Sequence, residues 1–500
     1  MQKSKIKIKE FHNFTFCNLN FDFYKIIALI LTLLLLPTCA VNPVTGEREL
    51  MLISEEQEIN MGKQAAPSLN WGFGGKYYDP ELEGYLGDIV KRIWANSHRP
   101  NLPFKFQVQN SSIPNAFALP GFVTITRGLL VEMENEAQFA AVMGHEVGHV
   151  MARHSAKRVS LGILQQIGLV AGSVAIEGQK GGDLFLTAGA LGSGLLLLKY
   201  DRNQEIQSDR LGVLYMSRIG YEPSEALNAH KVLESAVGKF LSRLGKEKKE
   251  ETFFEELFST HPRTAVRLEE IHAMIKELPL YTIQGDGRNA DKFNTMLRGI
   301  RDVNQAYLQY DNAEGAFNNG KINDAEESLK KAISMNGKQA PFHNLLGFVR
   351  IKQKRYTEAE SLFRKALEID NGYQPAYYGL GVLAYVNNNP KLATLHLKKS
   401  IEMFPEHPGS NFFLGLSYYA TRNYNGAIKY LSIFSSMAPQ HPEIHGYLGM
   451  SYEHVGDIHS AFNEYSMQVR IAPNSQLGKH ARQRLIVLSP FIQPPQPRKK

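Results

Sequence analysis

A glycine recurs about every 34 residues in the C-terminal part of the chain, and this period is the feature that most restricts its fold. The recurring glycines, each preceded by leucine and followed twelve residues later by alanine, are Gly347, Gly381, Gly415 and Gly449. A unit of this length cannot bury its apolar face alone, so successive units must stack. Small residues at two fixed positions indicate a pair of antiparallel helices in each unit, with Gly and Ala where the two backbones come closest. We therefore expect an α-solenoid over residues 306–488.

The period and its small residues resemble the tetratricopeptide repeat, over about residues 306–475, with residues 476–488 as a capping helix. Ala325 lies one period before Ala359, so a degenerate first repeat is expected to begin near Ala306. Three units are closed by prolines that recur with the same period, Pro405, Pro439 and Pro473. The resemblance implies a curved array whose concave face binds extended or helical partners and which carries no chemistry of its own.

Length and composition indicate an ordinary globular protein of several domains. A chain of 500 residues is too long for one compact core. The net charge of +7 is mild, and we find no basic stripe with interleaved aromatic residues, so nucleic acid is not an expected partner. The two cysteines, Cys17 and Cys39, precede the folded region. The rest of the chain therefore has no disulfide framework and no cysteine ligands, and any zinc must be held by histidines and carboxylates.

Residues 1–38 have the pattern of an export signal. Lys25 is followed by an apolar run over residues 26–36, which suits a signal-peptide core but is shorter than the ~20 residues of a membrane span. The run ends at Leu36-Pro37-Thr38-Cys39, which resembles a bacterial lipoprotein box with Cys39 as the lipid-bearing residue. Thr38 departs from the usual Gly, Ala or Ser at its position. Simple secretion after a nearby cleavage, or an uncleaved anchor, are the alternatives.

The sequence His145-Glu146-Val147-Gly148-His149 carries the expected chemistry. Positions i and i+4 of a helix differ by about 40° in azimuth and about 6 Å in rise, so the two imidazoles project from one face and can share a zinc ion. Glu146 lies beside the metal, where it can take a proton from a zinc-bound water. The sequence is expected to be helical from Glu132 to about Val159, and the alternation of apolar and polar residues over Ala137–Val150 supports a helix around the motif. The alternative is two histidines on an ordinary polar helix face.

A third ligand is available downstream, on a helix expected over residues 201–219. Glu205 and Asp209 lie on one face of that helix, so Glu205 can complete a site of two histidines and one glutamate that leaves a position for water. Asp209 would then accept from one imidazole and fix its tautomer. The alternative is an exposed acidic face. His154 lies five residues beyond His149, which on a continuous helix points about 140° away, so we expect it to be structural rather than a ligand.

These motifs together resemble metallopeptidase family 48, the gluzincins, over about residues 43–275. The segments that carry the resemblance are His145–His149, Glu205–Asp209, Asn115–Gly121 and Ser259–Pro262. The family usually has alanine where Ser208 stands. The resemblance implies a mainly α chain, with an α+β zinc-peptidase domain over residues 43–276 that contains a small sheet and holds one zinc ion.

By the same resemblance Glu146 is the general base, and zinc is held by His145, His149 and Glu205. His261 falls in a loop that in relatives can swing a histidine onto the metal as a self-inhibiting ligand; the alternative is an ordinary histidine at a helix start. Arg267 falls where relatives place an arginine near the cleft. With the repeats included, the chain resembles bacterial periplasmic proteases that act in the assembly and quality control of outer-membrane proteins.

The remaining segments complete the expected organisation. Strands are expected over residues 104–108 and 121–126. Asn115 to Thr126 is expected to be a strand that borders the cleft; the alternative is a merely structural hairpin. Peptidases of this type hold their substrate as an added strand, so Asn115, Ala116, Phe117 and Ala118 are the expected substrate strand. The apolar stretches Leu161–Ile176 and Leu184–Leu198 form either a buried helical hairpin or one that touches the membrane or roofs the site. Residues 277–305, with Pro279 and a Gly-Asp-Gly turn, are expected to be a linker.

The leading hypothesis is an exported zinc endopeptidase that acts on unfolded or misassembled proteins, with repeats that bind clients or outer-membrane assembly machinery. It would lie in the periplasm, anchored to the outer membrane through Cys39. The alternative is a chaperone-like repeat scaffold with a latent metal site. An integral-membrane prenyl-protein peptidase is disfavoured because no stretch of 18 or more apolar residues exists.

Overall fold

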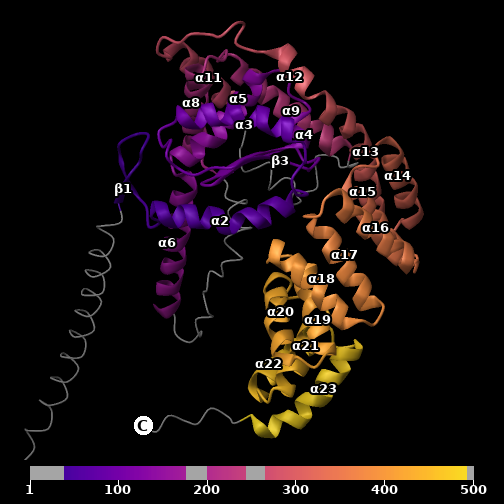
Figure 1. Cartoon of the computed structure of the whole chain (residues 1–500). Coiled ribbons are helices and arrows are strands. Elements are labelled where there is room, and N and C mark those ends of the chain that lie inside the picture. The colour runs from indigo at the N-terminus through magenta and orange to yellow at the C-terminus, as the bar shows by residue number, and fades with distance from the viewer. Residues whose placement is uncertain (1–38, 176–199, 244–264, 493–500) are drawn as a thin grey trace, which may run out of the picture.

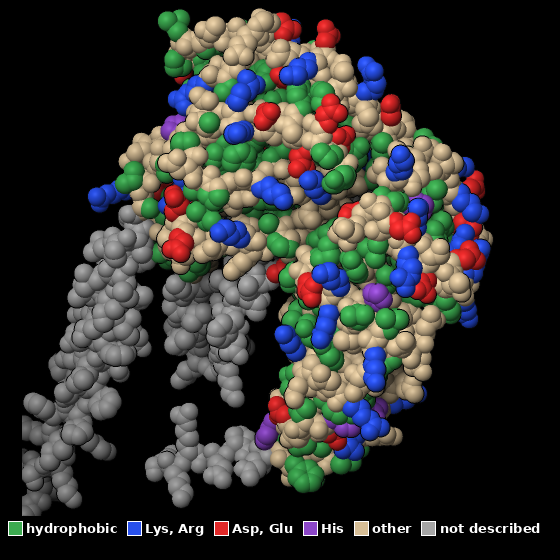
Figure 2. All heavy atoms as spheres, in the orientation of Figure 1, with side chains coloured by type: hydrophobic (Ala, Val, Ile, Leu, Met, Phe, Trp, Pro, Cys, Tyr) green, Lys and Arg blue, Asp and Glu red, His purple; other side chains and the backbone are tan. Residues whose placement is uncertain are grey.

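A computed structural model describes residues 39–175, 200–243 and 265–492. The expected export signal, the second apolar stretch and His261 lie outside the described residues. Figure 1 shows a helical body that contains a small sheet, followed by a curved array of helix pairs. Among the described residues, none of the helices combines the length and the apolar content needed to cross a bilayer. On the face shown in Figure 2, Lys and Arg side chains are interspersed with Asp and Glu, so this described face carries no continuous basic stripe.

The helical body is built from short strands and mostly amphipathic helices. In chain order its elements are β1 (Cys39–Val41), β2 (Arg48–Leu50), α2 (Glu55–Gly72), α3 (Pro80–Ala95), β3 (Phe106–Gln109), β4 (Ala116–Leu119), β5 (Phe122–Thr126), α4 (Arg127–Leu130), α5 (Glu136–Met151), α6 (His154–Ala175), α8 (Arg202–Arg218), α9 (Glu225–Arg243), α11 (Ala265–Glu277) and α12 (Ala290–Met296). Ser54 caps α2, where its hydroxyl accepts from the N–H of Gln57 and the Gln57 side chain accepts from the N–H of Ser54 in a capping box. The mainly α fold with a small sheet is confirmed.

The three-stranded sheet has the order β3-β5-β4. The central strand β5 pairs parallel with β3 and antiparallel with β4. Gly121, with a φ of +91°, makes the tight turn between β4 and β5. Residues 115–126 are therefore a hairpin rather than one strand, and β4 lies at the edge of this sheet.

The helices α5 and α8 cross with their backbones almost in contact. A Cβ atom added to Gly212 of α8 would lie 2.9 Å from the backbone nitrogen of His145 on α5, and one added to Gly144 would lie 3.0 Å from Gly212 Cα. Any larger residue at either position would force the two helices apart. Because α5 is buried along almost its whole length, this crossing fixes the position of α8 relative to the histidine motif.

The helix expected from Glu132 to Val159 is interrupted after Met151. Arg153 has a φ of +58°, the left-handed region, and α6 begins at the next residue. The Arg153 side chain is buried and donates to Glu58 Oε2 at 3.0 Å and to the carbonyl of Ile53 at 2.8 Å, both near the start of α2. These contacts hold a backbone conformation that is unfavourable for a residue with a Cβ atom.

The expected linker over residues 277–305 is wrong for most of its length. Its first part is a loop, but this loop is fixed by backbone hydrogen bonds such as that from Glu222 N–H to the carbonyl of Gly287. Its second part forms α12 and the start of α13 (Arg298–Asn318). Phe293, Leu297 and Ile300 are fully buried in the main core of the body. The turn residues indicate the loop correctly, but the helical spacing of these three apolar residues decides the structure of the rest.

The C-terminal array consists of five antiparallel helix pairs and one capping helix. Its elements after α13 are α14 (Ile322–Met335), α15 (Ala340–Lys352), α16 (Tyr356–Ile369), α17 (Gln374–Val386), α18 (Pro390–Met403), α19 (Pro408–Ala420), α20 (Tyr424–Met437), α21 (Ile444–His454), α22 (Ile458–Ile471), α23 (Gln476–Leu488) and the short 3-10 helix η2 (Ser489–Phe491). The stacked pairs form the curve on the right of Figure 1. The expected helical repeat array is confirmed, with its first helix beginning before Ala306.

The recurring glycines leave room for a large side chain of the second helix in each pair. A Cβ atom at any of them would lie 2.5–2.6 Å from a buried side chain. The four side chains that occupy this space recur with the same period as the glycines: Phe363, Leu397, Leu431 and Tyr465. The small residues are thus explained mainly by a side chain packed onto the helix backbone, and less by contact between two backbones.

Gly415→Ala is expected to lower the free energy of unfolding by about 1–3 kcal/mol, because the new methyl group would lie 2.5 Å from Leu431 Cγ in a close-packed contact. Gly315→Ala is the matched control. Gly315 is also inside a helix, but no neighbouring atom lies within 4 Å of the position that a Cβ would occupy, so alanine should stabilise that helix by about 0.5–1 kcal/mol. Urea unfolding of both variants measures the difference. Equal effects would contradict the packing role of Gly415.

The array is docked on the body by polar contacts near its start and further along, and Trp71 of α2 also packs against Tyr373 of α17. Near its start, the fully buried Arg127 lies with its guanidinium 3.8 Å from the centre of the Tyr307 ring of α13 and hydrogen-bonds Asn304. Further along, Ser68 of α2 donates to Glu406 Oε2 at 2.9 Å. The array is therefore joined to the body by specific polar contacts and does not extend from it as a separate arm.

Candidate metal centre

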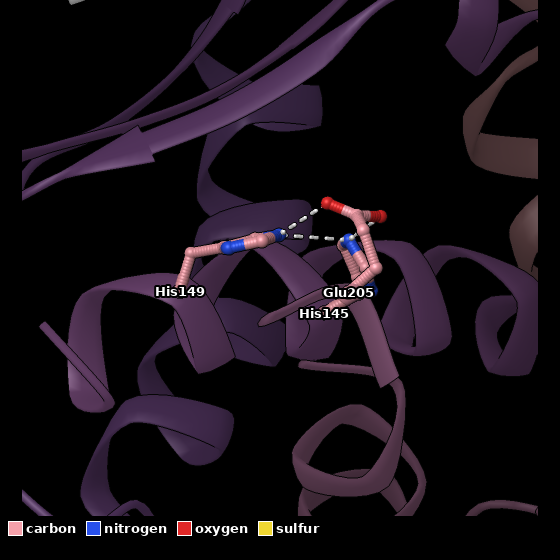
Figure 3. A group of neighbouring side chains, drawn as sticks. All are labelled: His145, His149 and Glu205. Atoms are coloured by element: carbon pink, nitrogen blue, oxygen red, sulfur yellow. Dashed lines mark hydrogen bonds and ion pairs between the residues drawn. The ribbon is translucent and has the colours of Figure 1, made fainter. Parts of the chain in front are cut away.

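Two imidazoles and one carboxylate converge between α5 and α8. The Nε2 atoms of His145 and His149 are 3.1 Å apart. Glu205 Oε1 lies 3.4 Å from Nε2 of His149, and Glu205 Oε2 lies 3.7 Å from Nε2 of His145. Figure 3 shows the three polar ends turned toward one another. Among the described residues, this is the group of His, Cys, Asp and Glu side chains that could hold a metal ion.

The spacing of these atoms fits zinc. Zinc bonds of about 2.0–2.1 Å in a tetrahedron place neighbouring ligand atoms about 3.3 Å apart. The observed separations of 3.1, 3.4 and 3.7 Å bracket that distance. Two imidazoles and one carboxylate are a donor set that leaves a fourth position, as catalytic zinc sites do. Glu205 and His149 are buried, while the His145 side chain is 13% exposed, so the group is reached from the His145 side.

Asp209 and Arg267 hold His145 and Glu205 in place. Asp209 Oδ1 lies 2.8 Å from Nδ1 of His145. Arg267 forms two hydrogen bonds with Asp209, at 2.6 and 2.7 Å, and its Nη1 lies 2.7 Å from Glu205 Oε2. Burial alone would raise the pKa of Asp209, but bonds from Arg267, His145 and His230 outweigh it and hold that pKa well below its usual range. An ionised Asp209 accepts the Nδ1 proton of His145, which leaves Nε2 to face the metal position.

His149 is held by residues of a different kind. Its Nδ1 lies 2.8 Å from Nδ1 of His154, whose Nε2 lies 2.8 Å from Gln207 Oε1. The Tyr200 ring stacks on the His149 imidazole, with 3.9 Å between their centres. The expectation that His154 points away from His149 is wrong, because the left-handed Arg153 ends α5 and turns the chain back. Burial lowers the pKa of His154 to about 4.

Comparison with known proteins agrees with this geometry. Residues 80–275 match the model of peptidase family M48, and residues 316–380 match a tetratricopeptide repeat model. The chain carries a peptidase family M48 domain. The M48 domain lies in front of the repeats, so the combination expected from the sequence is confirmed.

The curated relatives are named either as a metalloendopeptidase or as a protease. The mitochondrial metalloendopeptidase OMA1 of Schizosaccharomyces pombe is 28% identical over 242 residues, which cover 47% of this chain and 66% of that protein. The beta-barrel assembly-enhancing protease of Escherichia coli K12 is 24% identical over 343 residues, which cover 63% of this chain and 67% of that protein. The protein of the same name from Yersinia pestis is 27% identical over 250 residues, which cover 47% of this chain and 47% of that protein. The chain thus spans between about half and two thirds of the length of these relatives. Of the solved structures, YrrB, a TPR protein with an unusual peptide-binding site, is 21% identical and covers 36% of this chain and 92% of its own, with a TM-score of 0.30.

A cavity of about 60 Å³ opens beside the histidine motif of the M48 domain. Glu146 and His145 line it, together with Asn115 and Ala116 at the start of β4. Most of its wall is apolar, formed by Leu129, Ala141, Val142, Val213, Ala226, Ala229, Leu233 and Ile271. The catalytic carboxylate expected from the motif therefore faces a cavity suited to an apolar side chain.

The three residues of the expected substrate strand that lie in β4 divide between the two faces of the sheet. Ala116 and Ala118 face the main core and α5, whereas Phe117 packs against Phe73 near the end of α2. His230 also lines the cavity, with Nε2 3.5 Å from Asp209 Oδ1, although no sequence pattern marks it. The positions of Tyr200 and Gln207 at the site could not be predicted from the sequence either, because neither residue belongs to a recognisable metal-ligand spacing.

Proposed function

We propose that this chain is a zinc metalloendopeptidase that cleaves unfolded or misassembled polypeptides. The observation that carries the proposal is the convergence of His145, His149 and Glu205 at tetrahedral distances, beside Glu146 and an open cavity. In this proposal the three converging side chains hold one zinc ion, and Glu146 is the general base. The M48 domain and the relatives named metalloendopeptidase and protease support it.

The residues of the site divide the chemical work. Zinc, when bound, would act as a Lewis acid on water and on the peptide carbonyl. Glu146 follows His145 directly on α5, so its carboxylate lies at the cavity, where it takes a proton from the attacking water and passes it to the leaving amine. Asp209 keeps the proton of His145 on Nδ1, and Arg267 keeps Asp209 ionised and holds Asp209 and Glu205 in position.

The edge strand β4 offers a binding surface for an extended substrate. The N–H of Thr126 donates to the carbonyl of Asn115, so these two residues form a hydrogen-bonded pair of the hairpin. Such pairs alternate along an antiparallel ladder, which places the backbone groups of Ala116 and Ala118 on the side away from β5, where the N–H of Ala116 donates to Asn115 Oδ1. A substrate segment that adds to this edge must be extended, which favours unfolded polypeptide over folded protein.

The apolar cavity favours the same substrates. Its wall would accept an apolar side chain of the bound segment, next to the peptide bond that faces Glu146. Folded proteins bury such side chains, and unfolded or misassembled ones expose them. Strand addition and the apolar cavity would therefore favour unfolded polypeptides as substrates, with little dependence on their amino-acid sequence.

We also propose that the protein is exported and acts in the periplasm, anchored to the outer membrane through a lipid on Cys39. Support comes from the signal-like residues 1–38 and from relatives named beta-barrel assembly-enhancing protease. The repeat array would bind clients or outer-membrane assembly machinery and present them to the cleft. Its docking on the body through Arg127 and Ser68 gives a bound client a defined position relative to β4.

Metal analysis combined with a cleavage assay tests the proposed activity. Purified chain from residue 40 to residue 500 is expected to contain one zinc ion per molecule and to cleave unfolded casein. Removal of the metal with a chelator should abolish cleavage, and added zinc should restore it. Cleavage that persists in metal-free protein, or a purified chain that does not bind zinc, would overturn the proposal.

A further inference from the structure

We propose that His154 is a positioning residue for the zinc ligand His149, and that it acts by accepting the Nδ1 proton of that imidazole. The inference rests on the proposed zinc centre. It assigns a role to a side chain that lies outside both the histidine motif and the Glu205 segment. His149 and His154 are each 1% exposed, so the contact between them is shielded from water.

With Gln207 Oε1 facing His154, the hydrogen bonds around the two imidazoles select one arrangement of protons. The two Nδ1 atoms are 2.8 Å apart, so one of them must donate and the other accept. His154 Nε2 lies 2.8 Å from Gln207 Oε1, and an amide oxygen only accepts, so the proton of His154 is on Nε2. Its Nδ1 is then the acceptor, and the proton of His149 is on Nδ1. Nε2 of His149, the atom nearest to His145 and Glu205, is left with its lone pair directed at the metal position.

The surroundings of His154 hold this arrangement. Arg153 turns the chain between α5 and α6 and is fixed by the buried Glu58, so the His154 ring is brought back against His149. Gln207 lies on α8, between Glu205 and Asp209 in the sequence. A single helix therefore orients all three ligands. It supplies Glu205 directly, orients His145 through Asp209, and orients His149 through Gln207 and His154.

Loss of the acceptor has a defined consequence. Without His154 Nδ1, the Nδ1–H of His149 would be buried without this partner, or the proton would move to Nε2 and block the ligand atom. Either change weakens zinc binding. Because His154 acts only through His149, we expect a loss of zinc affinity, whereas the affinity for substrate at saturating zinc should remain.

Zinc titration of three variants tests the proposal. His154→Leu removes the acceptor and should raise the zinc dissociation constant about 10- to 100-fold, the usual effect of losing such a partner. His154→Asn places an amide oxygen close to the position of Nδ1 and should keep the constant within about 3-fold of the wild type. Gln207→Leu leaves His154 but removes the group that orders its proton, so an intermediate loss is expected. His343→Gln, at a buried histidine of the repeat array, is the control and should change nothing.

The measurements are made on the full mature chain by competition with a chromophoric chelator. The absorption spectrum of bound cobalt(II) gives a second readout of ligand geometry, and circular dichroism of the metal-free protein reports folding. If His154→Leu does not fold, the comparison of His154→Asn with Gln207→Leu decides the question. Equal zinc affinity in all folded variants would overturn the role of His154, as would a loss in His154→Asn as large as that in His154→Leu. A wild-type chain that does not bind zinc would instead overturn the proposed function itself.

Discussion

Glu146→Gln is expected to lower the rate of peptide hydrolysis about 10²- to 10⁴-fold while zinc remains bound. The amide has nearly the shape of the carboxylate but cannot take a proton from water. Glu146 is not one of the three converging ligand groups, so its replacement leaves the donor set of the metal unchanged. Cleavage of unfolded casein at saturating substrate, together with the zinc content of the same preparation, measures both quantities.

The control for Glu146→Gln is the same substitution at Glu269, an exposed residue of α11, which should leave the rate unchanged. Loss of zinc together with activity would mean that Glu146 helps to hold the metal and would contradict the assignment of a general base. A rate within a few-fold of the wild type would mean that the proton is taken by another group. The repeat scaffold with a latent metal site would then be the better interpretation.

The parts of the centre that depend on local geometry could be predicted from the sequence. The four-residue spacing of His145 and His149 brings their imidazoles together on any α-helix. Glu205 lies far beyond His149 in the chain, so its approach depends on how α5 and α8 pack, and the resemblance to a known family supplied that information. The close crossing at Gly144 and Gly212 is the physical basis of this packing.

The role of His154 could not be predicted, because it depends on contacts distant in the sequence. The helical pattern of the sequence continues past Met151, and nothing local marks the end of α5. The left-handed conformation of Arg153 is stabilised by Glu58, 95 residues earlier in the chain. A local pattern contains no information about that ion pair, so it predicts a continuous helix and the wrong direction for His154.

In the repeat array, too, local structure could be predicted from the sequence, whereas contacts between distant parts of the chain could not. Its constant period predicts helix pairs because each pair is a local unit that repeats. The cation–π contact between Arg127 and Tyr307, which docks the array on the body, involves two residues far apart in the chain, and neither belongs to a motif. The Gly and Pro residues of the expected linker indicate its first part, the loop, correctly. The prediction fails for the second part, because Phe293 and Leu297 are buried against distant parts of the body and form helices there.

Arg267→Met is expected to lower the free energy of unfolding of the metal-free protein by about 3–5 kcal/mol, the cost of breaking a buried ion pair. Arg267 is 3% exposed and lies between two buried carboxylates, Glu205 and Asp209. Methionine fills a similar volume but leaves both negative charges without the guanidinium. Urea unfolding in the presence of a chelator measures the loss.

A matched control and a double-mutant cycle separate the effect of charge from the effect of packing. Arg210→Met removes an arginine from the exposed pair with Glu277, whose side chains are 58% and 66% exposed, and should cost less than about 1 kcal/mol. In the Glu205→Gln background one of the two carboxylates is neutral, so Arg267→Met should cost about 0.5–3 kcal/mol less than in the wild type. An equal loss in both backgrounds would mean that Arg267 stabilises the M48 domain through its packing and its ion pair with Asp209 alone. The ion pair between Arg267 and Glu205 would then contribute nothing to stability.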